Sequence, residues 1–148
     1  MRLVRFMGAE EMEGYIAGLT LVNCTNWMID RHKATHSKGF CFFDDSVAPE
    51  KRMEYLTGIV DMTICAVFRP INTDELRVSY GRYRDPDKDE KVTSLSEALT
   101  ALTRPIVYQS VKEYSLEQYS KRTMQLDKIG LCVPFEHRIV WETRESVN

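Results

Sequence analysis

The sequence lacks the short motifs by which many enzymes are recognised. It contains no G-x-x-x-x-G-K-[ST] loop, no G-x-G-x-x-G turn, no H-E-x-x-H helix and no G-x-S-x-G elbow. Histidine is scarce: His32 and His36 have a spacing that suits metal chelation from one helix face, but no third ligand accompanies them and His137 is remote. We therefore predict no metal site, and no motif-defined enzyme class fits.

Long apolar runs and closely spaced cysteines are also missing. No stretch of 18 apolar residues exists, and no apolar core of a signal peptide is found. The cysteines Cys24, Cys41, Cys65 and Cys132 form no C-x-x-C pair, and three of them lie in apolar runs, which is typical of reduced, buried thiols. We expect a cytoplasmic protein that does not contact a membrane.

Charge of one sign is lacking as well. Twenty basic and 22 acidic residues give a net charge of -2, which disfavours binding to nucleic acid through the phosphate backbone. The 148 residues are 43% hydrophobic, enough for one sizeable core. No stretch rich in Pro, Gly or Ser divides them, so we predict a single domain over residues 1–148.

Strand and helix patterns alternate in the N-terminal part. Residues 2–7 are predicted to form a first strand that ends at Gly8. A helix is expected from about Ala9 to Leu19, with acids in its first turn, a solvated acidic face and Gly18 near its end. Its predicted core stripe has helical spacing and consists of Met12, Tyr15, Ile16 and Leu19. The aromatic run at residues 40–43 predicts a buried strand.

The rest of the chain predicts two more helices and several strands. A helix is expected from Ala48–Pro49 onward, followed by a strand at residues 62–68. Ser94 and Glu97 have the spacing of a capping box for a helix that ends before Pro105. Further strands are expected at residues 106–111, 117–122, 131–135 and 138–142, with a charged loop at residues 80–91.

These patterns predict an α+β fold. We expect about three helices on a mixed or split, antiparallel-rich sheet, with the first strand central. The side chains predicted for the core are those of Phe40, Phe42, Val67, Leu99 and Leu102.

A few polar residues stand out from this apolar framework. Arg5 shares a strand face with apolar residues, so its guanidinium either reaches an edge of the sheet or has a buried partner. Ser37 and Gly39 precede the aromatic strand, where they form either a ligand contact or an ordinary cap and turn. Glu113 and Glu117 follow a predicted late strand, as site carboxylates or as solvated acids.

An Arg on the first strand, a Ser beside the second and a Glu on a late strand resemble the ADP-ribosyltransferase superfamily of the Arg-Ser-Glu type. The resemblance implies a compact split-sheet domain that binds NAD in a cleft. A carboxylate would stabilise the oxocarbenium-like centre formed as the bond to nicotinamide breaks, and aromatic walls would stack on the nicotinamide. The implied catalytic residues are Ser37, Glu113 and Glu117, and the implied NAD-binding residues are Arg5, Asn23, Thr25, Gly39, Phe40, Tyr80 and Tyr119.

Nearly the whole chain also resembles small proteins of Gram-positive bacteria and their phages. The resemblance is carried by Leu21–Asn26, Ser37–Phe43, Tyr55–Val60 and Tyr80–Tyr83. Since some phage anti-CRISPR proteins of similar size are ADP-ribosyltransferases, it implies a role in the conflict between phage and host.

Two functional hypotheses follow. The first is an enzyme that consumes NAD, as a glycohydrolase or as a transferase to a protein acceptor. The second is a non-enzymatic binding or inhibitor protein that contacts its partner through the charged loop Gly81–Lys91. Convergence of the implied residues on one open cleft would favour the enzyme, because a binding protein has no need of it.

Overall fold

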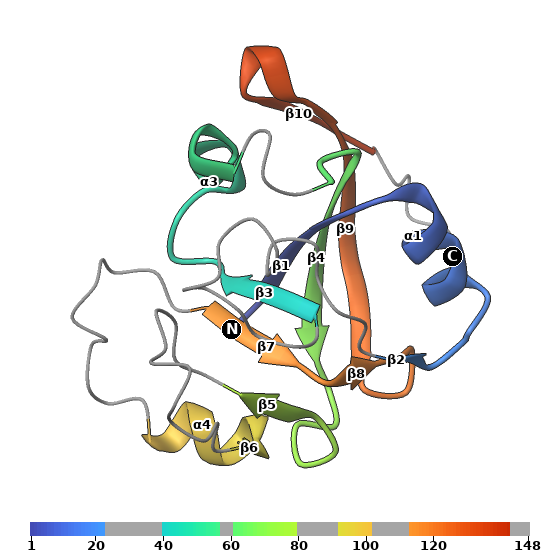
Figure 1. The fold of residues 1–148 in the computed structure, drawn as a ribbon, viewed down its shortest axis with the longest axis vertical. Helices are drawn as coiled ribbons and strands as arrows, with labels where there is room; N and C mark the ends of the chain where they lie inside the picture. Colours follow the sequence, from blue (N-terminus) through green and yellow to red (C-terminus); the bar gives the residue numbers. More distant parts are fainter. Residues whose placement is uncertain (23–39, 57–60, 80–91, 102–112, 143–148) are drawn as a thin grey trace, which may run out of the picture.

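The fold is built around one large sheet (Figure 1). The structure is a computed structural model, and it describes residues 1–22, 40–56, 61–79, 92–101 and 113–142. Eight strands pair in the order β10-β9-β4-β1-β3-β7-β5-β6, and β2 and β8 form a separate two-stranded sheet. All pairings among the described strands are antiparallel.

The elements have the following bounds. The strands are β1 (Leu3–Met7), β2 (Leu21–Val22), β3 (Phe40–Asp44), β4 (Ile64–Pro70), β5 (Arg77–Ser79), β6 (Val92–Ser94), β7 (Glu113–Leu116), β8 (Gln118–Tyr119), β9 (Met124–Val133) and β10 (Arg138–Trp141). The helices are α1 (Ala9–Ile16), α3 (Pro49–Leu56), α4 (Leu95–Ala101) and the short 3-10 helix η2 (Pro134–Glu136). The predicted α+β class, with three α-helices in the described part, is confirmed.

Strand β1 lies between β3 and β4 and is buried on both faces. Leu3 and Met7 point to the face that α1 covers. Val4 and Phe6 point to the opposite face, where they pack with Met53 of α3. A strand buried on both faces needs apolar residues at nearly every position, which explains the almost continuous apolar run of β1. The prediction that the first strand is central is confirmed.

Helix α1 is shorter than the sequence predicts. Gly18 takes a left-handed conformation with φ 80, which ends the helix after Ile16. The Gly18 amide donates to the Tyr15 carbonyl at 3.0 Å, and the Leu19 amide donates to the Gly14 carbonyl at 3.1 Å. These two bonds define a Schellman motif. Because the chain turns away here, Ile16 and Leu19 are exposed, and their prediction as core residues is wrong.

Helix α4 begins where its capping signal places it. The Ser94 hydroxyl accepts a hydrogen bond from the Glu97 amide at 3.2 Å. The Glu97 carboxylate accepts from the Thr93 hydroxyl, a contact that the capping-box signature does not predict. The other end of this predicted helix lies outside the described residues, as do Leu102, the strand expected at residues 106–111 and the loop expected at residues 80–91.

The C-terminal part forms a long hairpin. Strand β9 has ten residues and begins earlier than predicted. It ends where Pro134 opens η2, and His137 follows in the left-handed region with φ 49, which turns the chain into β10. The strand predicted at residues 117–122 is only partly correct, because β8 covers two residues and the turn 120–123 follows it. Strands β2, β5, β6 and β7 are not predicted by the sequence, and β7 falls between the strands expected at residues 106–111 and 117–122.

The aromatic run of β3 contributes to the main core as predicted. Phe42 is fully buried and its ring lies 5.8 Å from that of Phe68 and 5.1 Å from that of Tyr119. Phe40 and Val67 are also buried, and Leu99 is partly buried against the same core cluster as Phe42. Aromatic edge-to-face packing therefore links β3, β4 and β8.

Replacement of Phe42 by Ala should lower the free energy of unfolding by about 3 to 5 kcal/mol, because it leaves a cavity in this core. Denaturant titration measures the change. Phe135→Ala is the matched control, because Phe135 is exposed, and its effect should stay within about 0.5 kcal/mol. Equal losses in the two variants would contradict the burial of Phe42.

Candidate functional site

Arg5 of β1 is the centre of a polar cluster. Its Nε donates to Glu11 Oε2 and its Nη2 donates to Glu11 Oε1, both at 2.7 Å, so the pair is bidentate. The third nitrogen, Nη1, donates to the carbonyl of Cys41 on β3 at 3.0 Å. The side chains of Arg5 and Glu11 are 14% and 18% exposed. Each nitrogen of the guanidinium therefore has a partner within the chain.

Aromatic side chains enclose this ion pair. The Arg5 guanidinium carbon lies 5.0 Å from the centre of the Phe40 ring and 5.7 Å from that of Phe42. The hydroxyl of Tyr119 on β8 donates to Glu11 Oε2, the oxygen that Arg5 Nε also contacts. The cluster thus joins β1, α1 and β8 through the Glu11 carboxylate, and β3 through the Arg5 guanidinium.

The environment fixes the charge states of this cluster. Burial alone would lower the pKa of Arg5, but the hydrogen bond and negative charge of Glu11 outweigh burial and raise that pKa. Burial, followed by the charge of Glu11, raises the pKa of Tyr119 above its ordinary value. Arg5 is therefore a permanent cation and Tyr119 a neutral hydrogen-bond donor.

Three of the residues implied for NAD binding lie together in this cluster: Arg5, Phe40 and Tyr119. Glu117 does not join them through any contact of the described residues. It is partly buried between β7 and β8, and its amide donates to the Arg77 carbonyl at 3.0 Å.

Glu113 is the first residue of β7, four residues before Glu117, and its backbone pairs with Phe43 of β3. An extended strand separates the two positions by about 13 Å, so the geometry of β7 does not make them a carboxylate pair. The other implied residues lie outside the described part of the chain: Asn23, Thr25, Ser37, Gly39 and Tyr80, together with the side chain of Glu113.

Glu11 is a member of the Arg5 cluster that the sequence does not predict. The sequence predicts a solvated acidic face for the first helix, but the Glu11 carboxylate turns toward the sheet and contacts Arg5. The available signal was its place six residues after a strand-borne Arg, in the first turn of the helix that follows directly. In the described part of the chain, the carboxylate that contacts Arg5 is therefore that of Glu11.

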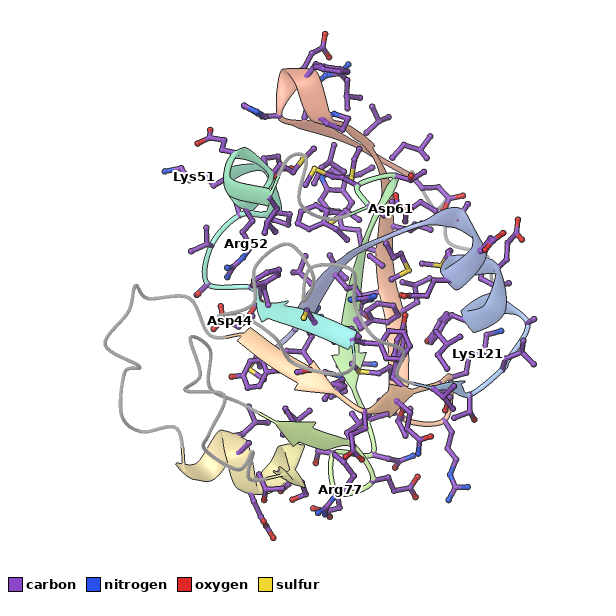
Figure 2. All side chains as sticks on the ribbon, in the orientation of Figure 1. Asp44, Lys51, Arg52, Asp61, Arg77 and Lys121 are labelled. Atoms are coloured by element: carbon purple, nitrogen blue, oxygen red, sulfur yellow. The ribbon has the colours of Figure 1, made fainter. Side chains whose placement is uncertain are left out.

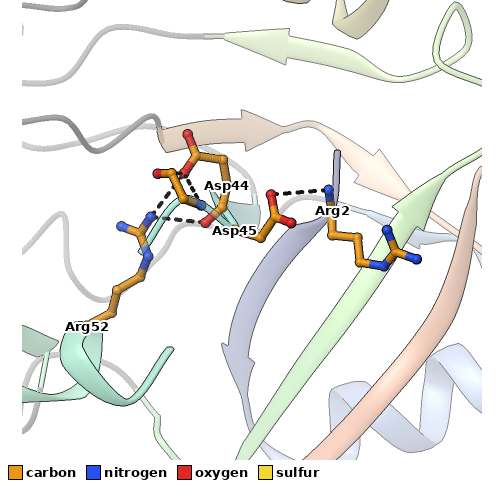
Figure 3. A network of polar contacts seen from close by, with 5 residues as sticks. Arg2, Asp44, Asp45 and Arg52 are labelled. Atoms are coloured by element: carbon orange, nitrogen blue, oxygen red, sulfur yellow. Dashed lines mark hydrogen bonds and ion pairs between the residues drawn. The ribbon is translucent and has the colours of Figure 1, made fainter. Parts of the chain in front are cut away.

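A second polar network ties α3 to the end of β3 (Figures 2 and 3). Arg52 Nη2 donates to the carbonyl of Asp44 at 3.0 Å and to its Oδ1 at 3.2 Å. The Arg52 guanidinium also lies 4.7 Å from the Phe43 ring centre. The amide of Ser46 donates to the same Asp44 carboxylate at 3.1 Å. Because Arg52 and Asp44 are both buried, this network anchors α3 against the sheet.

A small polar pocket lies beside β8. Its volume is about 200 Å³, and its lining residues are Thr20, Glu75, Gln118, Tyr119, Ser120, Arg122 and Thr123. An exposed ion pair of 2.9 Å joins Arg122 to Glu75 beside it. Of the described residues, Tyr119 is the one that this pocket shares with the predicted NAD site. No group of three His, Cys, Asp or Glu residues suited to a metal ion occurs among the described residues.

Exposed apolar side chains gather on the β9–β10 hairpin, which extends beyond the rest of the sheet (Figure 1). Leu131 and Val140 are 60% and 46% exposed and lie directly opposite each other in the hairpin register. Phe135, in the turn between the strands, is 97% exposed. We call these three residues the hairpin surface. Contiguous exposed apolar residues are typical of interaction sites.

No family model, curated protein or solved structure matches the chain. Within the described residues, no helix is both long and apolar enough to cross a membrane.

Replacement of Glu11 by Gln should lower the free energy of unfolding by about 2 to 3 kcal/mol, because Arg5 loses its bidentate ionic partner while it stays mostly buried. Glu13→Gln is the matched control on the exposed side of α1 and should change stability by less than about 0.5 kcal/mol. Denaturant titration of both variants is the measurement. An equal, small effect in both would show that the Arg5–Glu11 pair contributes little.

The raised pKa of Tyr119 predicts a loss of stability at alkaline pH. Above the ordinary Tyr pKa of about 10, the unfolded state loses the phenol proton while the native state retains it, so the free energy of unfolding falls as pH rises. Tyr119→Phe removes this contribution. The stability difference between wild type and Tyr119→Phe should therefore shrink above pH 10, as followed by denaturant titration at several pH values. A constant difference would contradict the coupling.

Proposed function

We propose that this chain is a non-enzymatic protein-binding protein and that the hairpin surface is its contact. The observation that carries the proposal is the exposure of three large apolar side chains on this hairpin at the projecting end of the sheet: Leu131 and Val140, which lie opposite each other, and Phe135 in the turn. Exposure of three large apolar side chains at one place is unfavourable in water unless a partner covers them. An inhibitor that acts in the conflict between phage and host is one form of such a protein.

The state of Arg5 supports the same proposal. Recognition of a pyrophosphate by Arg uses two parallel N–H groups of the guanidinium fork. In this chain Glu11 occupies that fork at 2.7 Å from both nitrogens, and the Cys41 carbonyl occupies the remaining nitrogen. A dinucleotide would have to displace a bidentate carboxylate, so the cluster is better suited to holding α1 on the sheet.

An NAD-consuming enzyme of the ADP-ribosyltransferase type is the second candidate. One observation favours it: Arg5, Phe40 and Tyr119 lie in one cluster, as that family resemblance implies. This candidate needs Ser37 and one of Glu113 and Glu117 beside the same cluster, and it needs NAD to replace Glu11 at Arg5.

A photo-crosslinking residue, p-benzoylphenylalanine, placed at position 135 tests the proposed contact. Irradiation of cells that express the protein should give a defined adduct, which Leu131→Asp suppresses because it places a charge on the hairpin surface. The same photo-crosslinker at Lys121 should give no such adduct, because this exposed residue precedes the opposite end of β9 (Figure 2).

Two results would overturn the proposal. The first is the absence of an adduct specific to position 135 in a wild type that is monomeric at every concentration. The second is release of nicotinamide from NAD by the purified wild type, abolished in Arg5→Met, which would establish the second candidate instead.

A further inference from the structure

Among the described strands, β10 is an edge strand, and none of them pairs with its outer side. The Glu142 amide donates to the Ile129 carbonyl at 2.8 Å, and β10 pairs with β9 in an unbroken antiparallel register. Since hydrogen-bonded pairs alternate along such a ladder, residues 138, 140 and 142 point their backbone groups toward β9. The Cys132 amide agrees with this, because it donates to Thr63 on the other side of β9. The amides and carbonyls of Ile139 and Trp141 therefore point away from the sheet.

We propose that β10 pairs antiparallel with β10 of a second copy of this chain. A two-fold axis would pass beside Val140, so that Ile139 of each copy lies opposite Trp141 of the other. This register joins the outward backbone groups in four hydrogen bonds and extends the sheet across both copies. The inference rests on the proposed function, since it names a second copy as the partner that the hairpin contacts.

Charge selects this register. Arg138 and Glu142 lie two residues to either side of Val140, on the same face of the strand, and both are exposed. Pairing about Val140 places each Arg138 opposite Glu142 of the other copy, which is favourable for directly opposed residues. Pairing about Ile139 would instead place Arg138 opposite Val140 of the other copy. Pairing about Trp141 would place Glu142 opposite Val140. The strand is thus self-complementary only about Val140.

The surface contacts of Arg138 are compatible with this pairing. Its Nε and Nη2 donate to Glu136 at 3.1 and 2.8 Å, and both side chains of this ion pair are 59% exposed. An exposed pair of this kind is weak, and Arg has five N–H donors, so a second carboxylate can be accommodated.

The side chains on both faces of the paired strands are compatible with this register. On the open face, Val140 of the two copies meets at the axis, flanked by Leu131 of each β9. On the other face, Ile139 packs in the cluster with Met53 of α3, and the Trp141 indole nitrogen donates to Glu50 at 3.3 Å. Dimerisation therefore brings Val140 of the two copies into contact, with Leu131 of each copy beside it.

A charge swap tests the register. Sedimentation of the purified full chain over a range of concentrations should show a monomer–dimer equilibrium. Arg138→Glu alone and Glu142→Arg alone should each weaken it by roughly tenfold, because like charges then oppose each other twice. The double variant, and an equal mixture of the two single variants, should restore dimerisation. Lys121→Glu, which is remote from β10, is the control for a change of net charge.

Hydrogen exchange gives a second readout. The amides of Ile139 and Trp141 should become protected as the protein concentration rises, while that of Val140 is protected by β9 at every concentration. A wild type that is monomeric throughout, or a dimer that is indifferent to the charge swap, would overturn the inference. If the wild type is monomeric but position 135 cross-links to another protein, the proposed function stands without the dimer. If it is monomeric and no adduct forms, both fail.

Discussion

The Arg5–Glu11 ion pair is the interaction on which the arrangement of the central sheet depends. A guanidinium that is mostly buried on the central strand needs an anion, because the cost of removing the charge from water is otherwise large. Glu11 meets that need from the first turn of α1, which fixes where the helix lies on the sheet. The same carboxylate accepts from Tyr119, so β8 and its partner β2 are positioned by it too. One charged pair therefore sets the relation of four elements.

Some of this fold was readable from residue patterns. Ser94 and Glu97 locate the start of α4, and the aromatic residues of β3 identify a buried strand, because each of these signals acts over a few neighbouring residues. Strands β2, β5 and β6 have only two or three residues, too few for any periodicity to appear, so pairing with other strands defines them. The sequence predicts too long a first helix because its apolar spacing continues through Ile16 to Leu19, although Gly18 turns the chain before Leu19.

In the candidate sites too, local signals are readable from the sequence and tertiary contacts are not. The sequence indicates that Arg5 requires an anion, but an acidic side chain and a bound pyrophosphate satisfy that requirement equally well. The choice of Glu11 depends on how α1 folds back on β1, which is a tertiary relation. Likewise, the sequence predicts strands at residues 131–135 and 138–142 without indicating which face of them is covered. Helix α3 lies on one face of the hairpin, and Leu131 and Val140 are left exposed on the other.

The strand order has a consequence for synthesis of the chain. Strand β4 lies between β1 and β9, and β9 begins only at residue 124. Strands β1, β3 and β4 are all made within the first half of the chain, so they are available to pair while β4 still has one open edge. That edge belongs to five buried residues in succession, Ile64 to Phe68, and is the kind of unpaired apolar strand that invites aggregation. During synthesis, a chain in which β9 has not yet been made therefore exposes an aggregation-prone edge on β4.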